Sequence, residues 1–360
     1  MSRNTYRIAV LPGDGIGKEI VPEGVRALEA VAQRFNIDMS FDWFDFASCD
    51  YYLKHGTMMP EDWKVRIGQH DAIYFGAVGA PKLVPDSVAG WGSIMKFRHE
   101  FEQYINLRPV KLLPGVPSPL AGRGPADIDM VIVRENTEGE YSPVGGRLFA
   151  GTDRELAIQE TVMTRVGIDR VVRFAFELAR KRERKQITSA AKANALPFTM
   201  MLWDERVEEI AAEFPDVHCD RKLIDALVAH LVLAPNDFDV IVATNLFGDI
   251  LSDLAAGCAG TLGVAPSGNI NPERNFPSMF EPVHGSAPDI AGQGIANPTA
   301  QIWAGAMMLE HLGEADAARA LEEAIVEALS EPKLRTPDLN GSATTVELGK
   351  AIADFVALES

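Results

Sequence analysis

Residues 8–35, IAVLPGDGIGKEIVPEGVRALEAVAQRF, set the pattern that the rest of the chain repeats. The apolar run Ile8–Leu11 predicts a short buried strand, and PGDGIG is a glycine-rich turn. From about Gly17 to Phe35, apolar residues recur at helical spacing, which predicts a helix. A strand, a tight turn and a helix form the basic unit of an α/β protein.

The same alternation continues along the chain, which predicts a sheet with helices on both faces. Glycine and proline are concentrated in 81–92, 114–125 and 263–298, and we expect long functional loops there. The predicted strands are Ala72–Phe75, Met130–Val133, Leu156–Thr161, Ile187–Ala190 and Val240–Ala243, and later helices are predicted at about 171–181, 299–312, 315–329 and 345–358.

The glycines of the first turn invite comparison with the dinucleotide-binding motif GxGxxG. Gly13 and Gly15 fit that motif, but its third glycine would fall at position 18, which is Lys18. We therefore interpret the turn as a tight corner between strand and helix.

Length and charge narrow the class of protein. The chain has 360 residues, which at roughly 150 residues per domain predicts about two domains. Its 34 basic and 51 acidic side chains give a net charge of −17, which argues against binding to nucleic acids or anionic membranes.

No apolar segment approaches the ~20 residues needed to span a bilayer. The first residues contain no signal peptide, and Cys49, Cys219 and Cys258 lie far apart, so we expect a soluble cytoplasmic protein with free thiols.

Three aspartates are candidate metal ligands. Asp249 and Asp253 are four residues apart in a predicted helix, so their carboxylates lie on one face within reach of one ion. Asp225 lies in the apolar segment RKLIDALVAHL, where a lone charge needs a partner. Such a set suits Mg²⁺ or Mn²⁺. The spacing alone leaves open that these residues are helix caps and solvated acids.

Three arginines are candidate ligands for carboxylates. Arg98 and Arg108 are ten residues apart in KFRHEFEQYINLRPV, and Arg134 follows a predicted strand. A guanidinium group can donate two charge-assisted hydrogen bonds to one carboxylate. Taken one at a time, these arginines could equally form surface ion pairs.

Together, these residues match the pattern of a known family. The chain resembles the β-decarboxylating dehydrogenases, the isocitrate/3-isopropylmalate dehydrogenase family, almost from end to end. The motifs that carry the resemblance are LPGDGIGKEI, NLRPV, VIVRENTEGEY, AKAN, NLFGDILSDLAAG and EPVHGSAPDIAGQGIANP. The resemblance implies that Asp225, Asp249 and Asp253 bind Mg²⁺ or Mn²⁺, and that Arg98, Arg108 and Arg134 hold the substrate carboxylates.

Within the family, WGSIMKFR (Trp91–Arg98) resembles the tartrate and D-malate dehydrogenases (decarboxylating). Isopropylmalate enzymes have a leucine-rich segment here, and isocitrate enzymes have serine and asparagine for a third carboxylate. A bulky Trp91 and an apolar Ile94 fit a four-carbon 2-hydroxy diacid, because neither offers a polar partner to a further carboxylate. We expect both residues to line the substrate site.

The resemblance also implies the catalytic groups and the cofactor. Lys192 would take the proton of the substrate hydroxyl, and Tyr141 would protonate the enol after CO₂ leaves. Asp289 would accept hydrogen bonds from the adenosine ribose and repel a 2′-phosphate, so we expect NAD⁺ and not NADP⁺. The expected cofactor-binding residues are Asn194, Glu281, His284, Gly285, Ser286, Ala287, Asp289, Ile290 and Asn297.

The implied reaction converts D-malate to pyruvate and CO₂, and converts some tartrates to oxaloglycolate without decarboxylation. The implied fold is the isopropylmalate dehydrogenase type, a large twisted mixed sheet flanked by helices. Its NAD-binding domain would contain 1–100 and 257–360, and its catalytic and dimerisation domain 101–256, with the site in the cleft between them.

The resemblance further implies a homodimer with shared active sites, because the lysine and one aspartate come from the neighbouring subunit in this family. Two alternatives stay open: a 3-isopropylmalate dehydrogenase, and a non-catalytic regulatory or acid-binding subunit. A requirement for a monovalent cation, found among relatives, is also left open by the sequence.

Overall fold

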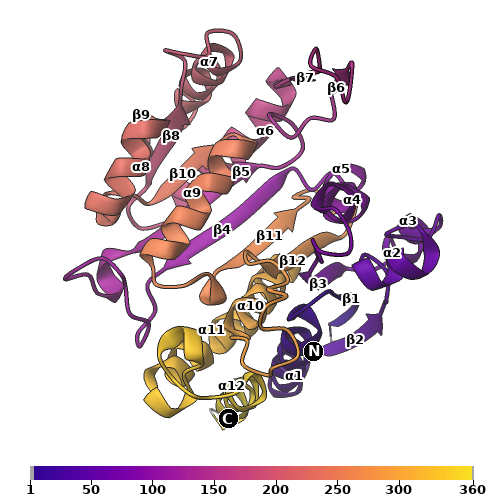
Figure 1. The fold of residues 1–360 in the computed structure, drawn as a ribbon. Helices are drawn as coiled ribbons and strands as arrows, with labels where there is room; N and C mark the ends of the chain where they lie inside the picture. The colour runs from indigo at the N-terminus through magenta and orange to yellow at the C-terminus, as the bar shows by residue number, and fades with distance from the viewer. Residues whose placement is uncertain (1–3, 359–360) are drawn as a thin grey trace. The chain divides into compact units, whose positions relative to one another are not determined.

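The computed structural model describes residues 4–358 and divides into two compact units (Figure 1). The first unit contains Met1–Gln103, Lys111–Pro125 and Ala256–Ser360, and the second contains Tyr104–Val110 and Ala126–Ala255. This division groups Lys111–Pro125 with the first unit. The assignment of the predicted domains to NAD binding and to catalysis stays a prediction.

The strands of the first unit lie in the order β2-β1-β3-β12-β11. The pairs β1–β2, β1–β3 and β3–β12 are parallel, whereas β11 and β12 are antiparallel, so this part of the sheet is mixed. The elements are β1 (Thr5–Gly13), α1 (Gly17–Arg34), β2 (Asp38–Trp43), α2 (Cys49–His55), α3 (Trp63–Ile67), β3 (Ala72–Ala77), α4 (Asp86–Gly92), α5 (Ile94–Glu100), β11 (Pro266–Ile270), β12 (Ser278–Pro282), α10 (Thr299–Leu312), α11 (Ala315–Ser330) and α12 (Thr345–Leu358).

Side chains of β1 and β3 alternate between two packed layers, as the two-residue period of a strand requires. Leu11 and Phe75 belong to a cluster that contains Trp63 of α3 and Phe97 of α5. In the opposite direction, the Tyr74 hydroxyl donates to the carbonyl oxygen of Gln301 on α10. Every residue of β3 is buried, which accounts for its uninterrupted apolar pattern.

The strands of the second unit lie in the order β4-β5-β10-β8-β9. The pairs β5–β10, β10–β8 and β8–β9 are parallel, so the carboxyl ends of these strands lie at one edge. Helix α6 packs against β5, β8 and β10. The elements are β4 (Ile105–Lys111), β5 (Asp129–Glu135), β6 (Gly145–Leu148), β7 (Leu156–Gln159), α6 (Arg165–Lys181), β8 (Gln186–Ala191), α7 (Thr199–Ala211), β9 (His218–Leu223), α8 (Ile224–Leu233), β10 (Val240–Ala243) and α9 (Asn245–Cys258).

Most predicted elements are present, with two corrections. The loop predicted at 81–92 contains α4, and the loop predicted at 263–298 contains β11 and β12. Strand β12 lies between β3 and β11, so hydrogen bonds to both neighbours hold a short segment in the sheet. Pairing of this kind leaves no periodic pattern in five residues, and the glycines and prolines nearby therefore indicated a loop.

The first turn is a tight corner between β1 and α1. Gly13 and Gly15 have positive φ angles of 70° and 52°. A Cβ atom on Gly15 would lie 2.0 Å from the carbonyl oxygen of Ser286. The backbone N–H of Ile16 donates to that same oxygen, so the corner is bonded to the segment that follows β12.

Candidate active site

Helix α9 carries the centre of the candidate site. It starts at Asn245, directly after β10, which places its first turns at the carboxyl edge of the parallel strands. Asp249 and Asp253 are one turn apart on this helix, as their spacing predicted. Two neighbouring carboxylates offer the hard oxygen ligands that Mg²⁺ and Mn²⁺ prefer.

Arg108 of β4 joins the two aspartates. Its Nη1 atom lies 3.2 Å from Asp249 Oδ1 and 3.5 Å from Asp253 Oδ1, and it donates to Ser252 Oγ at 2.6 Å. Partial burial raises the pKa of Asp253 and the charge of Asp249 adds to the rise, whereas Arg108 opposes it. A bound cation would favour the charged form of this partly buried carboxyl group.

Arg134, at the end of β5, reaches the same carboxylate. Its Nη1 atom pairs with Asp249, and its Nε and Nη2 atoms donate to Asn245 Oδ1 at 3.0 and 2.7 Å. A Cβ atom on Gly248 would lie 2.6 Å from Arg134 Cβ, so the glycine allows α9 to lie directly against this arginine.

Tyr141 completes the cluster around Asp249. Its hydroxyl donates to Asp249 Oδ2 at 2.8 Å, and Arg134 Cζ lies 5.3 Å from the centre of its ring. Asp249 thus accepts from two arginines and a tyrosine. The structure brings together five of the predicted site residues: Arg108, Arg134, Tyr141, Asp249 and Asp253.

Lys192 and Asp225 form a separate pair. Lys192, just after β8, donates to Asp225 Oδ1 at 2.8 Å, and this hydrogen bond lowers the pKa of Asp225. Asp225 was expected to be a costly charge in an apolar helix. Instead, its side chain is 67% exposed in the first turn of α8. Asn194 is exposed as well.

The three aspartates are not gathered within one chain. Among residues 4–358, no three acidic, histidine or cysteine side chains are close enough to hold a metal ion together. One chain therefore offers two of the predicted ligands, Asp249 and Asp253, and leaves the third exposed.

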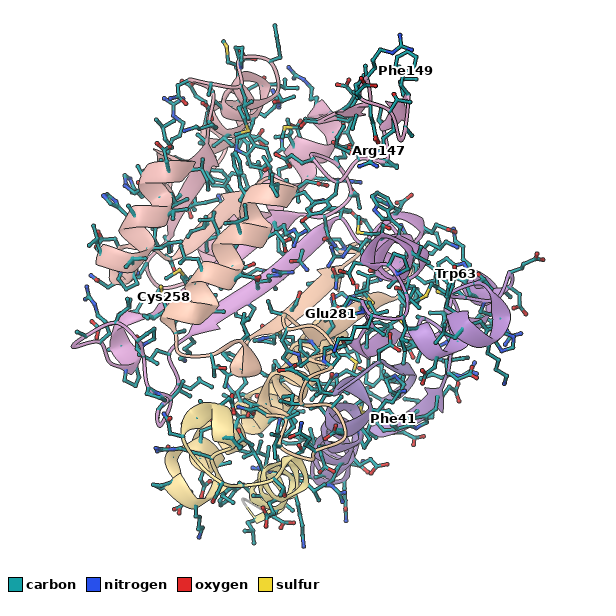
Figure 2. All side chains as sticks on the ribbon, viewed as in Figure 1. Phe41, Trp63, Arg147, Phe149, Cys258 and Glu281 are labelled. Carbon is teal, nitrogen blue, oxygen red and sulfur yellow. The ribbon has the colours of Figure 1, made fainter. Side chains whose placement is uncertain are left out.

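Other predicted residues belong to the first unit. Arg98 of α5 is buried, with Nη2 3.6 Å from Glu281 Oε1, and Glu281 also accepts from Asn269 at 2.8 Å. The Trp91 ring lies 5.9 Å from the His99 ring, and Ile94 packs partly against the aromatic core beside β3. Figure 2 labels Glu281 at the end of β12.

A cavity of about 270 Å³ in the first unit is the candidate cofactor pocket. Ile16, Ile290 and Ile295 form apolar walls, and His284 and Asn297 contribute polar groups. His284 Nδ1 lies 2.9 Å from the carbonyl oxygen of Gly285, whereas its buried Nε2 atom has no hydrogen-bond partner. Burial lowers the pKa of His284, which favours the neutral ring with Nε2 as an acceptor. The apolar walls of this pocket and the Nε2 acceptor suit a flat heterocyclic ring such as adenine.

The predicted cofactor residues beside this cavity differ in exposure. Ser286 is buried, and its hydroxyl donates to the carbonyl oxygen of Gly79 at 2.6 Å. Ala287 has a positive φ of 39°, and Gly285 and Asp289 are exposed. The Asp289 carbonyl oxygen accepts from Gln293 at 2.9 Å, so the backbone of this segment is held while the Asp289 carboxylate faces outward.

Sequence reasoning missed several residues that build the cluster. Asn245 Nδ2 donates to the carbonyl oxygen of Glu138 at 3.0 Å. The Glu140 carboxylate accepts from the Leu246 N–H at 3.1 Å and from the Thr244 hydroxyl at 3.3 Å. Both side chains lie within the quoted motifs, but no spacing rule marks a contact with a distant backbone group.

The antiparallel hairpin β6–β7 was also missed as a feature. Every residue of both strands is exposed, including the apolar Leu148, Leu156 and Ile158. Figure 2 labels Arg147 on β6 and Phe149 in the turn that follows this strand. An isolated two-stranded ribbon is marginally stable in water, and exposed apolar patches are typical of interaction surfaces.

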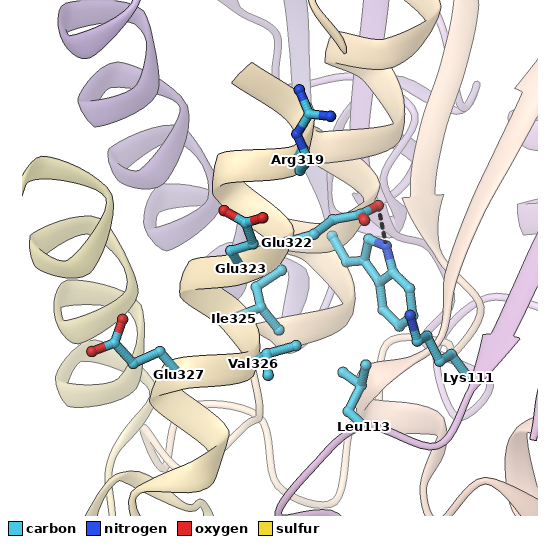
Figure 3. A pocket seen from close by; sticks show the side chains of 9 residues that line it. Lys111, Leu113, Arg319, Glu322, Glu323, Ile325, Val326 and Glu327 are labelled. Atoms are coloured by element: carbon cyan, nitrogen blue, oxygen red, sulfur yellow. Dashed lines mark hydrogen bonds between the residues drawn. The ribbon is translucent and has the colours of Figure 1, made fainter. Parts of the chain in front are cut away.

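A further cavity of about 440 Å³ lies between α10, α11 and the segment that follows β4 (Figure 3). Lys111 and Leu113 line one side, and the Trp303 indole N–H donates to Glu322 at 3.1 Å. None of the predicted site residues lines this cavity.

Comparison with known proteins identifies the family. The family model described as isocitrate/isopropylmalate dehydrogenase matches residues 7–352. The chain belongs to the isocitrate/isopropylmalate dehydrogenase family. This dehydrogenase is 57% identical to the D-malate dehydrogenase [decarboxylating] of Escherichia coli (strain K12), over 98% of this chain and 99% of that relative. It is 56% identical to a tartrate dehydrogenase/decarboxylase of Pseudomonas putida, over 99% of each chain.

The solved structures agree with the family assignment. An isocitrate dehydrogenase from Methylococcus capsulatus superposes with a TM-score of 0.87 at 38% identity, and the match covers 98% of this dehydrogenase and 100% of that chain. The predicted isopropylmalate dehydrogenase-like fold and the likeness to tartrate and D-malate dehydrogenases are confirmed. The chain is an enzyme, and its relatives support oxidative decarboxylation of a hydroxy acid. In the described residues, no helix is both long and apolar enough to cross a membrane.

Proposed function

We propose that this dehydrogenase oxidises a short 2-hydroxy diacid, D-malate or a tartrate, with NAD⁺ and with Mg²⁺ or Mn²⁺. The observation that carries the proposal is the convergence of Arg108, Arg134 and Tyr141 on Asp249. Two guanidinium groups beside a carboxylate pair provide charges for a chelated dianionic substrate. The names of the two relatives support the choice of a four-carbon acid.

Each residue has a defined part in the proposed reaction. When bound, the divalent ion supplies positive charge beside the substrate oxygens, and NAD⁺ supplies the hydride acceptor. Arg98, Arg108 and Arg134 hold the carboxylates. Lys192 takes the hydroxyl proton at Nζ as the C2 hydrogen leaves as hydride and a C2 ketone forms.

The second half of the reaction uses Tyr141. For D-malate, the bond between C3 and its carboxylate breaks, CO₂ leaves, and the Tyr141 hydroxyl protonates C3 to give pyruvate. A tartrate gives oxaloglycolate by the oxidation step alone, and that product can leave before it loses CO₂.

The candidate cofactor pocket favours NAD⁺ over NADP⁺. The exposed Asp289 carboxylate is two residues beyond Ala287, which lines the cavity with His284 and Ile290. A carboxylate accepts hydrogen bonds from ribose hydroxyls and repels a phosphate on the same ring. The three cysteines are free thiols, which suits work in a reducing cytoplasm.

We further propose that the enzyme is a homodimer whose active sites are shared. Within the described part of one chain, no third acidic, histidine or cysteine side chain joins Asp249 and Asp253, and the exposed Asp225, paired with the half-buried Lys192, could supply it to a neighbouring copy. Exposed apolar residues of the second unit offer a surface for that copy. They include Val144, Leu148, Phe149, Leu156, Ile158, Leu196, Phe198, Met201, Val232 and Leu233.

A substrate panel tests the reaction. Wild-type enzyme with Mn²⁺ and NAD⁺ is offered D-malate, each tartrate isomer, isocitrate and 3-isopropylmalate, with and without K⁺, and NADH is followed by absorbance. We expect the highest kcat/KM for a four-carbon acid. Preference for 3-isopropylmalate would overturn the substrate assignment, and absence of turnover with every acid would favour a regulatory or acid-binding subunit.

Mixed dimers test the sharing of sites. Lys192→Met and Asp249→Asn should each inactivate a homodimer. If sites are shared, a mixed dimer contains one site with both changes and one unchanged site, so a random equal mixture should recover about a quarter of wild-type activity. If each chain holds a complete site, the mixture recovers nothing.

A further inference from the structure

The start of α9 is hydrogen-bonded both to Arg134 and to the segment that contains Tyr141. The two side chains that make these contacts have no part in the proposed chemistry. Asn245 and Glu140 make these contacts. Asn245 is 1% exposed, and both ends of its side-chain amide are hydrogen-bonded. Its oxygen accepts from Arg134, and its nitrogen donates to the carbonyl oxygen of Glu138.

Asn245 determines where the Arg134 guanidinium points. Two of the guanidinium nitrogens donate to the same amide oxygen, at 3.0 and 2.7 Å, which orients the planar group with Nη1 toward Asp249. The partner is a neutral amide, so it orients Arg134 without cancelling its charge. An aspartate in this place would make a salt bridge and weaken the attraction of Arg134 for a substrate carboxylate.

Glu140 determines where the chain before Tyr141 lies. Its carboxylate bonds the Thr244 hydroxyl and the N–H of Leu246, at the start of α9, where the helix dipole also favours a negative charge. Tyr141 is the next residue, and its hydroxyl bonds Asp249 one turn along the same helix. Glu140 and the Tyr141 hydroxyl therefore attach this segment to α9 at two points.

We propose that Asn245 and Glu140 are positioning residues, which hold Arg134 to grip the substrate carboxylate and Tyr141 to protonate the enol. This inference rests on the proposed function. In this proposal, contacts with the start of α9 fix the positions of the Arg134 guanidinium and the Tyr141 hydroxyl. Displacement of a group by about 1 Å can lower a rate by about a hundredfold, so the two contacts should control activity.

Asn245 is tested by Asn245→Ala and Asn245→Asp, with the exposed Asn275→Asp as the charge-matched control. We expect kcat/KM for D-malate to fall by about tenfold to a hundredfold in both Asn245 variants, the range expected when an interaction with a charged group is lost. The KM for NAD⁺ should stay within about twofold, because His284 and Asp289 belong to the first unit. A purely structural role would lower the melting temperature and leave kcat/KM of the folded enzyme unchanged, and that result would overturn the proposal.

Binding of malonate, a short diacid with no hydroxyl to oxidise, separates this proposal from the proposed function. Calorimetry with Mn²⁺ should show weaker malonate binding by Asn245→Ala than by wild type, even if wild type turned over none of the acids in the panel. Equal affinities for malonate, or no malonate binding by wild type, would overturn the role of Asn245.

Glu140 is tested by a double-mutant cycle, which also serves if the Asn245 variants do not fold. Glu140→Ala should reduce the decarboxylation of added oxaloacetate by about tenfold or more, whereas Glu140→Gln, which keeps an oxygen acceptor, should recover part of that loss. In a Tyr141→Phe background, Glu140→Ala should have little further effect on decarboxylation, because the hydroxyl group that Glu140 positions is already absent. Fully additive losses would show that Glu140 does not act through Tyr141.

Discussion

Lys192 donates to Asp225 at 2.8 Å, from the end of β8 to the first turn of α8. The two side chains differ in exposure, because Lys192 is 25% exposed and Asp225 is 67% exposed. In the proposed dimer, this pair faces the neighbouring site and brings a base and a metal ligand together. The contact therefore links a prediction about catalysis to one about assembly.

Replacement of the lysine tests its role as the base. Lys192→Met keeps the length of the side chain and removes the amine, so we expect hydride transfer from D-malate to be lost, by a factor of about a hundred or more. NAD⁺ binding, measured by calorimetry, should be near normal. Turnover close to wild type would rule out Lys192 as the proton acceptor.

Replacement of the tyrosine hydroxyl separates the two half-reactions. Tyr141→Phe removes the bond to Asp249 Oδ2 and the proposed proton donor, while the ring can still lie beside Arg134. We expect decarboxylation of oxaloacetate to fall by about a hundredfold or more and oxidation to fall less. Equal losses in the two measured partial reactions would contradict a role as the acid.

Reversal of the charge at position 289 tests cofactor choice. Asp289→Lys removes a ribose acceptor and places a cation where a 2′-phosphate would lie, so the ratio of kcat/KM with NAD⁺ to that with NADP⁺ should fall by about tenfold or more. The control is Asp354→Lys, on the exposed side of α12. The contact with ribose would be ruled out by an unchanged ratio.

The hairpin β6–β7 is expected to contribute to the dimer interface. The double substitution Leu148→Ser and Phe149→Ser removes two exposed apolar side chains and should raise the dimer dissociation constant by about tenfold or more. Analytical ultracentrifugation measures this constant, with Val65→Ser of α3 as a control at an exposed apolar residue of the first unit. The hairpin would have no part in assembly if the two variants had the same dissociation constant.

Glu135 should make the enzyme less stable as the pH rises. Burial raises the pKa of its carboxyl group, although the N–H groups of Glu138 and Thr137 oppose the rise. A raised pKa means that the folded chain keeps a proton that the unfolded chain releases above its usual value of about 4.3. Stability is therefore lost as the pH rises from that value through the pKa of the folded state.

The test of this pH dependence is Glu135→Gln, which cannot ionise. Relative to this variant, wild type should lose unfolding free energy as the pH rises above about 4.3, as measured by urea titration. The exposed Glu183→Gln serves as the control. Parallel curves for wild type and Glu135→Gln would contradict the expectation.

Local patterns were sufficient to predict parts of the site. Strand Val240–Ala243 was predicted to the residue, and the four-residue spacing placed Asp249 and Asp253 one turn apart on α9. Both inferences depend on the side-chain period, which is two residues in a strand and 3.6 residues in a helix. Local backbone geometry sets these periods, so they can be recognised in the sequence. The roles of Arg108 and Arg134 came instead from a family pattern.

The sequence by itself established the alternation of strands and helices and the residue types of the site. Only the tertiary structure brought Arg108, Arg134 and Tyr141 to one carboxylate, because the strand order β4-β5-β10 makes neighbours of segments that are far apart in the chain. It alone showed the contacts of Asn245 with Arg134 and of Glu140 with the start of α9. A hydrogen bond between distant groups forms only when the fold brings its donor and acceptor within about 3 Å, and such a contact leaves no period in the sequence.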